Sequence, residues 1–246
     1  MDRMIYLAMS TAQQLMLRQA SNNHNLANVN TPGFRADLDA LMQKPVYGPG
    51  EASRVYVQSE RAGIDLDPGT IMQTGRPLDV AINSKGFIAV QAPDGSEAYT
   101  RAGDLRITPT GILQTGAGHP VLGEGGPIAV PPFEQIEIGA DGTISIIPTG
   151  QGNTALTAVD RIKLVLPDPT QLKKTPEGLL QLGDGQVAPA DASVQLAGGA
   201  LETSNVNSVE ALVTMIELAR QFETNTKLIG IARENDAAST RLLEIS

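Results

Sequence analysis

Two histidines and two aspartates are the residues whose types could carry chemistry in this sequence. His24 and His119 lie far apart, and neither has a second ligand at helical spacing, so the sequence predicts no metal site. Asp79 and Asp104 could serve as the paired carboxylates of a hydrolase, but no base, nucleophile or cofactor motif stands beside them. We interpret both as structural acids that bind backbone N–H groups or nearby arginines.

The other candidate motifs are incomplete. The glycine-rich stretches 116–118 and 123–126 complete neither a phosphate-binding loop nor a dinucleotide fingerprint, and the serines lack a nucleophile elbow. The chain has no Cys, which removes thiolate nucleophiles and thiolate metal ligands. We therefore expect a protein that is not an enzyme and needs no cofactor.

Composition excludes two further classes of partner. The net charge is −9, aromatic residues make up 3% and Trp is absent, which argues against nucleic-acid binding because that requires basic patches and stacking platforms. No apolar run is long enough for insertion into a membrane. The first residues do not have the shape of a secretory signal, so we expect a chain that stays in the cytoplasm or is exported without a cleaved signal.

The distribution of helix breakers predicts the architecture. All 16 prolines lie between Pro32 and Pro189, and only Gly230 follows Gly199 among the 25 glycines. Two breaker-free ends around a breaker-rich middle indicate an α+β protein with a helix at each end. We divide it into an N-terminal helix, an extended connector with some β character, a central β body and a C-terminal helix, at residues 1–36, 37–75, 76–200 and 201–246.

Both ends carry apolar residues at helical spacing. In the first helix the stripe consists of Ile5, Met9, Ala12, Met16 and Leu26. In the last, a heptad pattern runs through Leu212, Met215, Ala219, Phe222 and Ile229. We expect the two helices to form a coiled-coil-like helical core domain, and the alternative is that each packs on the chain's own body.

The middle of the chain reads as short β-strands separated by turn signals. Apolar β-prone runs occupy residues 78–82, 86–92, 136–139, 143–147 and 161–166. Turn sequences such as Ala140-Asp141-Gly142 separate them. This spacing predicts a mainly antiparallel, all-β body.

Three blocks of the sequence, residues 23–37, 75–123 and 198–229, together resemble the flagellar rod and hook proteins. The opening of the chain and the segments 126–132 and 140–145 look most like the proximal-rod members, and the distal-rod members or a related hook-type protein are the alternative. The resemblance implies a structural subunit of a helical tube that encloses the export channel and transmits torque. It also implies passage through the flagellar type III export apparatus without a cleaved signal.

The same resemblance implies which partners and residues matter. The partners would be other rod proteins, both proximal and distal, and copies of the chain itself, in a rod that crosses the periplasm. We assign the assembly interface to the two helical stripes named above and to Asn28 and Asn30, which we expect to bind backbone at the end of the first helix. A secreted β-rich binding module, whose helices merely close the domain, remains the alternative from another class.

Overall fold

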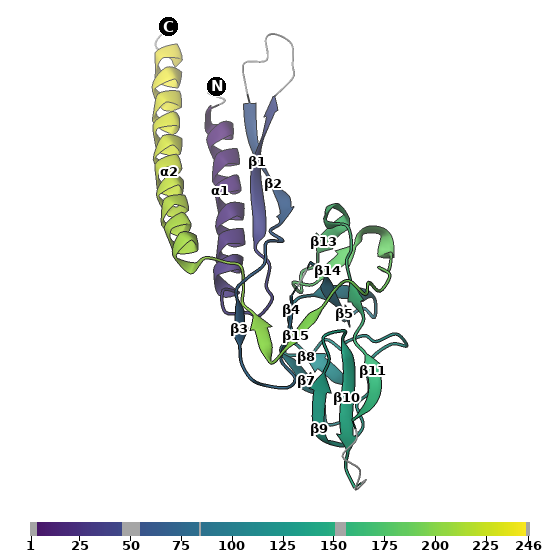
Figure 1. The fold of residues 1–246 in the computed structure, drawn as a ribbon. Helices are drawn as coiled ribbons and strands as arrows, with labels where there is room; N and C mark the ends of the chain where they lie inside the picture. Colours follow the sequence, from purple (N-terminus) through teal and green to yellow (C-terminus); the bar gives the residue numbers. More distant parts are fainter. Residues whose placement is uncertain (1–3, 46–54, 84, 151–155, 245–246) are drawn as a thin grey trace. The chain divides into compact units, whose positions relative to one another are not determined.

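The computed structural model describes residues 4–45, 55–83, 85–150 and 156–244, which fall into two compact units (Figure 1). Unit 1 comprises Met1–Asn28, Asp37–Asp65 and Val206–Ser246, and unit 2 comprises Val29–Ala36 and Leu66–Asn205. The short segment Val29–Ala36 therefore belongs to unit 2, although it lies in the sequence between two parts of unit 1.

Unit 1 is built on two helices that run in opposite directions, α1 (Met4–Ala27) and α2 (Ser208–Glu244) (Figure 1). Asn207 caps the start of α2, because its side-chain oxygen accepts from the backbone N–H groups of Val209 and Glu210 at 3.1 and 3.3 Å. At ~1.5 Å per residue α2 is about 55 Å long and α1 about 36 Å, so α2 outreaches its partner.

A β-hairpin completes unit 1. Strands β1 (Asp37–Pro45) and β2 (Val55–Ile64) pair antiparallel with a register shift between Leu38 and Asp39, and they contact α1. The sequence indicated only some β character in this stretch. A hairpin that lies against a helix gains a covered face, which two strands need because they are marginal alone.

One part of the predicted fold is wrong. The predicted coiled-coil-like helical core domain is not present: the described residues contain α1 and α2 as their only α-helices, and a hairpin joins them in unit 1. Heptad spacing exists, but the fully buried positions hold mostly Ala and Asn, while larger apolar side chains of both helices lie exposed. The broader α+β class, with terminal helices and a β-rich middle, agrees with the structure.

Unit 2 is a set of small antiparallel sheets. Its largest sheet has the strand order β12-β5-β6-β14-β13, and a second has the order β11-β10-β9. Three two-stranded pairs, β15-β4, β16-β3 and β7-β8, complete it with two short 3-10 turns. The bounds are β3 Ile71–Gln73, β4 Val80–Ile82, β5 Phe87–Gln91, β6 Glu97–Thr100, β7 Leu105–Ile107, β8 Leu113–Thr115, β9 Phe133–Ile138, β10 Thr143–Pro148, β11 Thr157–Arg161, β12 Leu164–Val165, β13 Leu172–Lys174, β14 Leu180–Leu182, β15 Leu196–Gly198 and β16 Ala200–Glu202.

The core of unit 2 is made of branched aliphatic side chains that alternate along these strands. In β10, Ile144 and Ile146 are buried and Ser145 between them is half-buried, as expected for a strand with one covered face. Buried Val80, Ile88 and Leu113 come from three other strands of the same cluster. The apolar runs that the sequence assigned to strands are thus the residues that hold this unit together.

Candidate assembly surface

Two side-chain amides fix α1 against α2. Asn225 Nδ2 donates to the Ala8 carbonyl oxygen at 2.7 Å, and Asn22 Nδ2 donates to the Ala211 carbonyl oxygen at 2.8 Å. From the first contact to the second, residue numbers fall along α2 and rise along α1, so the two helices are antiparallel. The contacts are equally far apart on both helices, so Leu15 and Leu218 lie level with each other, midway between them. Each helix therefore donates one side-chain amide hydrogen bond to the other helix and accepts one from it.

The buried side chains follow the same register. Ala8 and Leu15 are buried on α1, seven residues apart. On α2 the buried positions recur at every seventh residue, which keeps them on one side of the helix. They are Ala211, Leu218, Asn225 and Ala232.

The residues assigned to the assembly interface on α1 divide into two groups. Ile5, Ala12 and Leu26 are half-buried, whereas Met9 and Met16 are 56% and 57% exposed. The side chains of α1 that are buried in the chain are therefore those of Ala8 and Leu15, each one residue before an assigned methionine.

The assigned residues on α2 divide in the same way. Met215, Phe222 and Ile229 are half-buried, whereas Leu212 and Ala219 are exposed. The buried side chains are again those one residue earlier, Ala211 and Leu218. The sequence did not reveal these buried positions because most of them are Ala or Asn, which give little apolar signal. Leu15 and Leu218 are the two larger apolar residues among them. Whether the assigned residues contact neighbouring subunits stays a prediction.

An apolar stripe remains uncovered on the side of α2 opposite Leu218. It follows the i, i+3, i+4, i+7 spacing of an amphipathic helix face, and its side chains are between 44% and 68% exposed. We call it the outer stripe, and it consists of Val209, Leu212, Val213 and Ile216. Farther along the helix the exposed side carries charged residues, including the ion pair of Glu223 with Lys227 at 2.9 Å, together with the exposed Ile231.

The asparagine-rich end of α1 holds the start of the hairpin. Asn25 exchanges two hydrogen bonds with the backbone of Asp37, donating to its carbonyl oxygen at 3.0 Å and accepting from its N–H at 2.9 Å. His24 Nδ1 lies 3.0 Å from the carboxylate of Asp37. Asn28 Nδ2 donates to the His24 carbonyl oxygen at 2.9 Å, and Asn30 lies exposed in the turn that follows.

Within unit 2, a buried carboxylate ties the segment after α1 to the strand that precedes α2. Glu202 is 1% exposed, and its two oxygens bind Arg35 at 2.5 Å and Arg101 at 2.9 Å. The backbone N–H of Gly69 donates to the same carboxylate at 2.8 Å, and Gly33 N–H donates to the Glu202 carbonyl oxygen at 2.8 Å. One acid thus joins four chain segments that are distant in sequence.

The two candidate catalytic aspartates are neighbours, but both are engaged structurally. Asp79 and Asp104 face each other across an isolated antiparallel bridge. The buried Asp79 carboxylate accepts from Thr74 Oγ1 at 2.7 Å and pairs with Arg76 at 3.5 Å. The Asp104 carboxylate packs in the space that the missing side chain of Gly116 leaves.

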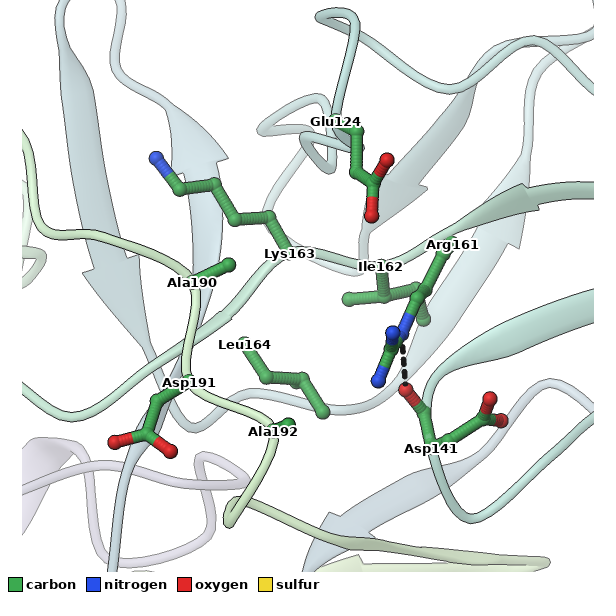
Figure 2. Close-up of a pocket in the computed structure, with 9 residues that line it drawn as sticks. All are labelled: Glu124, Asp141, Arg161, Ile162, Lys163, Leu164, Ala190, Asp191 and Ala192. Carbon is green, nitrogen blue, oxygen red and sulfur yellow. Dashed lines mark hydrogen bonds between the residues drawn. The ribbon is translucent and has the colours of Figure 1, made fainter.

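A surface hollow of 160 Å³ in unit 2 gathers charged residues of both signs (Figure 2). Arg161 Nε donates across it to the Asp141 carbonyl oxygen at 2.9 Å (Figure 2). Hydrogen bonds from Thr143 hold the pKa of Asp141 below its ordinary value, and hydrogen bonds from Ser193 do the same for the pKa of Asp191. Both acids are therefore poor proton donors near neutral pH.

Two further features of the described residues bear on function. They contain no cluster of three or more His, Cys, Asp or Glu side chains placed to hold a metal ion. None of their helices combines the length and the apolar character needed to cross a membrane.

Comparison with known proteins shows that the chain is similar to flagellar rod proteins over its full length. Residues 197–242 match the family described as flagellar basal body rod FlgEFG protein C-terminal, and residues 81–146 match the flagellar hook protein FlgE/F/G D1 domain. The chain is 44% identical to the flagellar basal-body rod protein FlgF of Salmonella typhimurium strain LT2 and 43% identical to that of Escherichia coli K12, with 100% of each chain covered. It is 35% identical to FlgG of Buchnera aphidicola subsp. Schizaphis graminum, over 89% of this chain and 90% of that one.

The first matched region spans most of α2, which carries the outer stripe, and the second spans β4 to most of β10 in the body. With full-length identity of 44%, this shows that the chain belongs to the flagellar basal-body rod proteins, in the FlgF group of that family.

Proposed function

We propose that this chain is a structural subunit of the flagellar basal-body rod, where it assembles with other rod proteins and with copies of itself. The observation that carries the proposal is the full-length identity to FlgF relatives. The exposed apolar stripe on a helix that is already packed on its other side adds physical support. The rod is the helical tube that encloses the export channel and transmits torque across the periplasm.

The outer stripe can supply much of the driving force for assembly. Full burial of one Val, Leu or Ile side chain is worth about 1.5–3 kcal/mol, and the four side chains of the stripe are each roughly half exposed. Covering all four would therefore yield roughly 3–6 kcal/mol. A stripe on one helix that meets a different surface of the next subunit makes a contact that need not close, which suits an open helical array.

We place the subunit in the proximal rod. The FlgF relatives that are 44% and 43% identical are matched over 100% of each chain, whereas the FlgG relative quoted above is matched over 89% of this chain and 90% of its own. Expression of the chain in strains that lack either FlgF or FlgG tests this placement: rescue of motility in the first strain alone is expected. Rescue only in the strain that lacks FlgG would assign the chain to the distal rod.

We also propose that the chain reaches the rod through the flagellar type III export apparatus, and that no signal peptide is cleaved from it. The family membership and the N-terminal sequence support this route. Mass spectrometry of the chain recovered from basal bodies is expected to find residues 4–27 at its N-terminal end intact. A form shortened within α1 would refute the uncleaved route.

The assembly surface itself is tested by Ile216→Lys, which puts a charge into the outer stripe. The matched control is Thr224→Lys, at an exposed position of the same helix outside the stripe. We expect Ile216→Lys to lower incorporation into purified basal bodies at least about tenfold, because a Lys buried in an apolar contact loses its hydration. Circular dichroism of both purified variants should match the unmodified chain. Normal incorporation of Ile216→Lys would refute the outer stripe as the assembly surface.

A further inference from the structure

We infer that Asn22 and Asn225 set the register of α1 against α2 and so decide which outer faces of the helix pair an assembly partner meets. The second half of this inference rests on the proposed function, whereas the first does not. It arises from the reciprocal arrangement of the two amides, each of which donates to a backbone carbonyl of the opposite helix.

Both acceptor positions are alanines. The carbonyl oxygens of Ala8 and Ala211 belong to helical residues, and a carbonyl has a second lone pair that can accept from a side chain. Both alanines are buried, and Asn225 is only 6% exposed. A methyl side chain leaves room for the amide to reach the backbone, which a Leu at the same place would block.

Apolar packing alone does not select this register. The buried positions recur every seven residues, so a slip by one heptad would again align the same sides of the helices. A slip in one direction would bring Asn225 level with Leu15 and Asn22 level with Leu218, and a slip in the other would carry both asparagines past the end of the opposite helix. Both amides would then lose their carbonyl acceptors, and a buried donor without a partner is disfavoured strongly. A polar residue between paired helices specifies register by the same logic.

Register matters because the outer faces belong to different helices. A slip of seven residues translates one helix by about 10.5 Å along the other. The exposed side chains of α1, among them Met9 and Met16, would move by that distance relative to the outer stripe of α2. A partner that contacts both helices would then lose one of its two contacts.

Disulfide trapping tests the register, since the natural chain contains no Cys. The pair Leu15→Cys with Leu218→Cys reports the register described here. The pairs Leu15→Cys with Ala211→Cys and Ala8→Cys with Ala232→Cys report the two slipped registers. Each pair is oxidised in the purified full-length chain, and intrachain products are separated from dimers on non-reducing gels.

With Asn22 and Asn225 present, we expect cross-linking of the 15/218 pair and little of the slipped pairs. With Asn22→Leu and Asn225→Leu combined, we expect slipped cross-links to rise at least about tenfold, because the polar penalty on slippage is gone. Asn225→Ala is measured alongside, in case the double variant folds poorly. Asn23→Leu, next to Asn22 but exposed, is the matched control and should keep the 15/218 product alone.

Two results would overturn the inference: absence of the 15/218 product with both asparagines present, or the same single product in every variant. Neither result depends on assembly, so they are distinct from normal incorporation of Ile216→Lys, which would refute the assembly surface and leave the register standing.

Discussion

Replacement of Glu202 by Ala removes the carboxylate that joins the two connecting segments of unit 2. The structure gives this acid two arginine partners at 2.5 and 2.9 Å, and Arg35 and Arg101 are only 3% and 6% exposed. Arg101 keeps other contacts after the change, because its Nε donates to the Gly86 carbonyl oxygen and its guanidinium lies 5.5 Å from the centre of the Phe87 ring. Neither contact supplies a negative charge.

The expected loss is large for a single substitution. Removal of one partner from a buried ion pair typically costs about 3–5 kcal/mol, because the remaining charge stays buried without compensation. Here two guanidinium groups lose the same counter-charge, so we expect the upper part of that range. For a unit of roughly 150 residues each kcal/mol lowers the melting temperature by about 2–4 °C. The transition of unit 2 should therefore fall by about 8–20 °C.

Differential scanning calorimetry of the full chain measures this shift. Glu223→Ala is the control, because it removes an exposed carboxylate whose partner Lys227 is also exposed, and such pairs contribute little. No measurable shift is expected for it. A loss below about 1 kcal/mol for Glu202→Ala would refute the claim that this buried acid holds the connecting segments together.

Two further predictions concern backbone and acid stability. Gly33 has a φ of +67°, and a Cβ there would lie 2.2 Å from the Arg101 carbonyl carbon, so Gly33→Ala should cost at least about 2 kcal/mol in urea unfolding. Gly118→Ala, at a φ of +92° with open space around it, should cost about 1 kcal/mol, and equal losses would contradict the proposed clash. Hydrogen bonds from Ser96 lower the pKa of Asp94 from its ordinary 3.8, so its stabilising contribution is complete above that value and is lost as the pH falls through the lower folded-state pKa. Ser96→Ala should return the Asp94 pKa towards 3.8 in an NMR titration, and an unchanged pKa would contradict this cause.

Much of the fold could be predicted because local signals agree with the tertiary structure. Asn207 stands directly before α2, and its side chain caps the helix, as is typical of an asparagine at that position. The run 136–147, with Asp141-Gly142 at its turn, forms the β9–β10 hairpin, in which Ile138 pairs with Ile144. In both cases residues close in sequence determine the structure.

The β1–β2 hairpin escaped prediction because its determinants are not local. Residues 37–45 alternate only weakly between polar and apolar side chains, so they lack the usual strand signature. Their position depends on Asn25, which binds both backbone groups of Asp37 from the end of α1. A sequence pattern can show that a stretch is rich in asparagine, but not which strand those amides will hold.

The assignment of the assembly interface stays a prediction, but the burial of its residues within the chain is known: Ile5, Ala12 and Leu26 on α1 and Met215, Phe222 and Ile229 on α2 are half-buried. The other assigned residues, Met9, Met16, Leu212 and Ala219, are exposed, and the residue before each of them is buried between the helices. The buried row between the helices was not predicted, because Ala8, Ala211 and Asn225 give little apolar signal in the sequence. Close packing at Ala8 and Ala211 allows the amide bonds, and size alone does not reveal that advantage.

The exposure of large apolar side chains on both helices supports assembly through this helix pair. A helix pair that completed its own fold would turn its largest apolar side chains inwards, because each buried aliphatic group adds stability in proportion to its area. Here alanines and an asparagine occupy much of the buried row, while Met9, Met16 and Ile216 lie more than half exposed. Polar bonds link the two helices, and large apolar side chains stay exposed on both. This arrangement suits a subunit in which polar bonds position the helices first and neighbouring subunits cover the exposed apolar side chains afterwards.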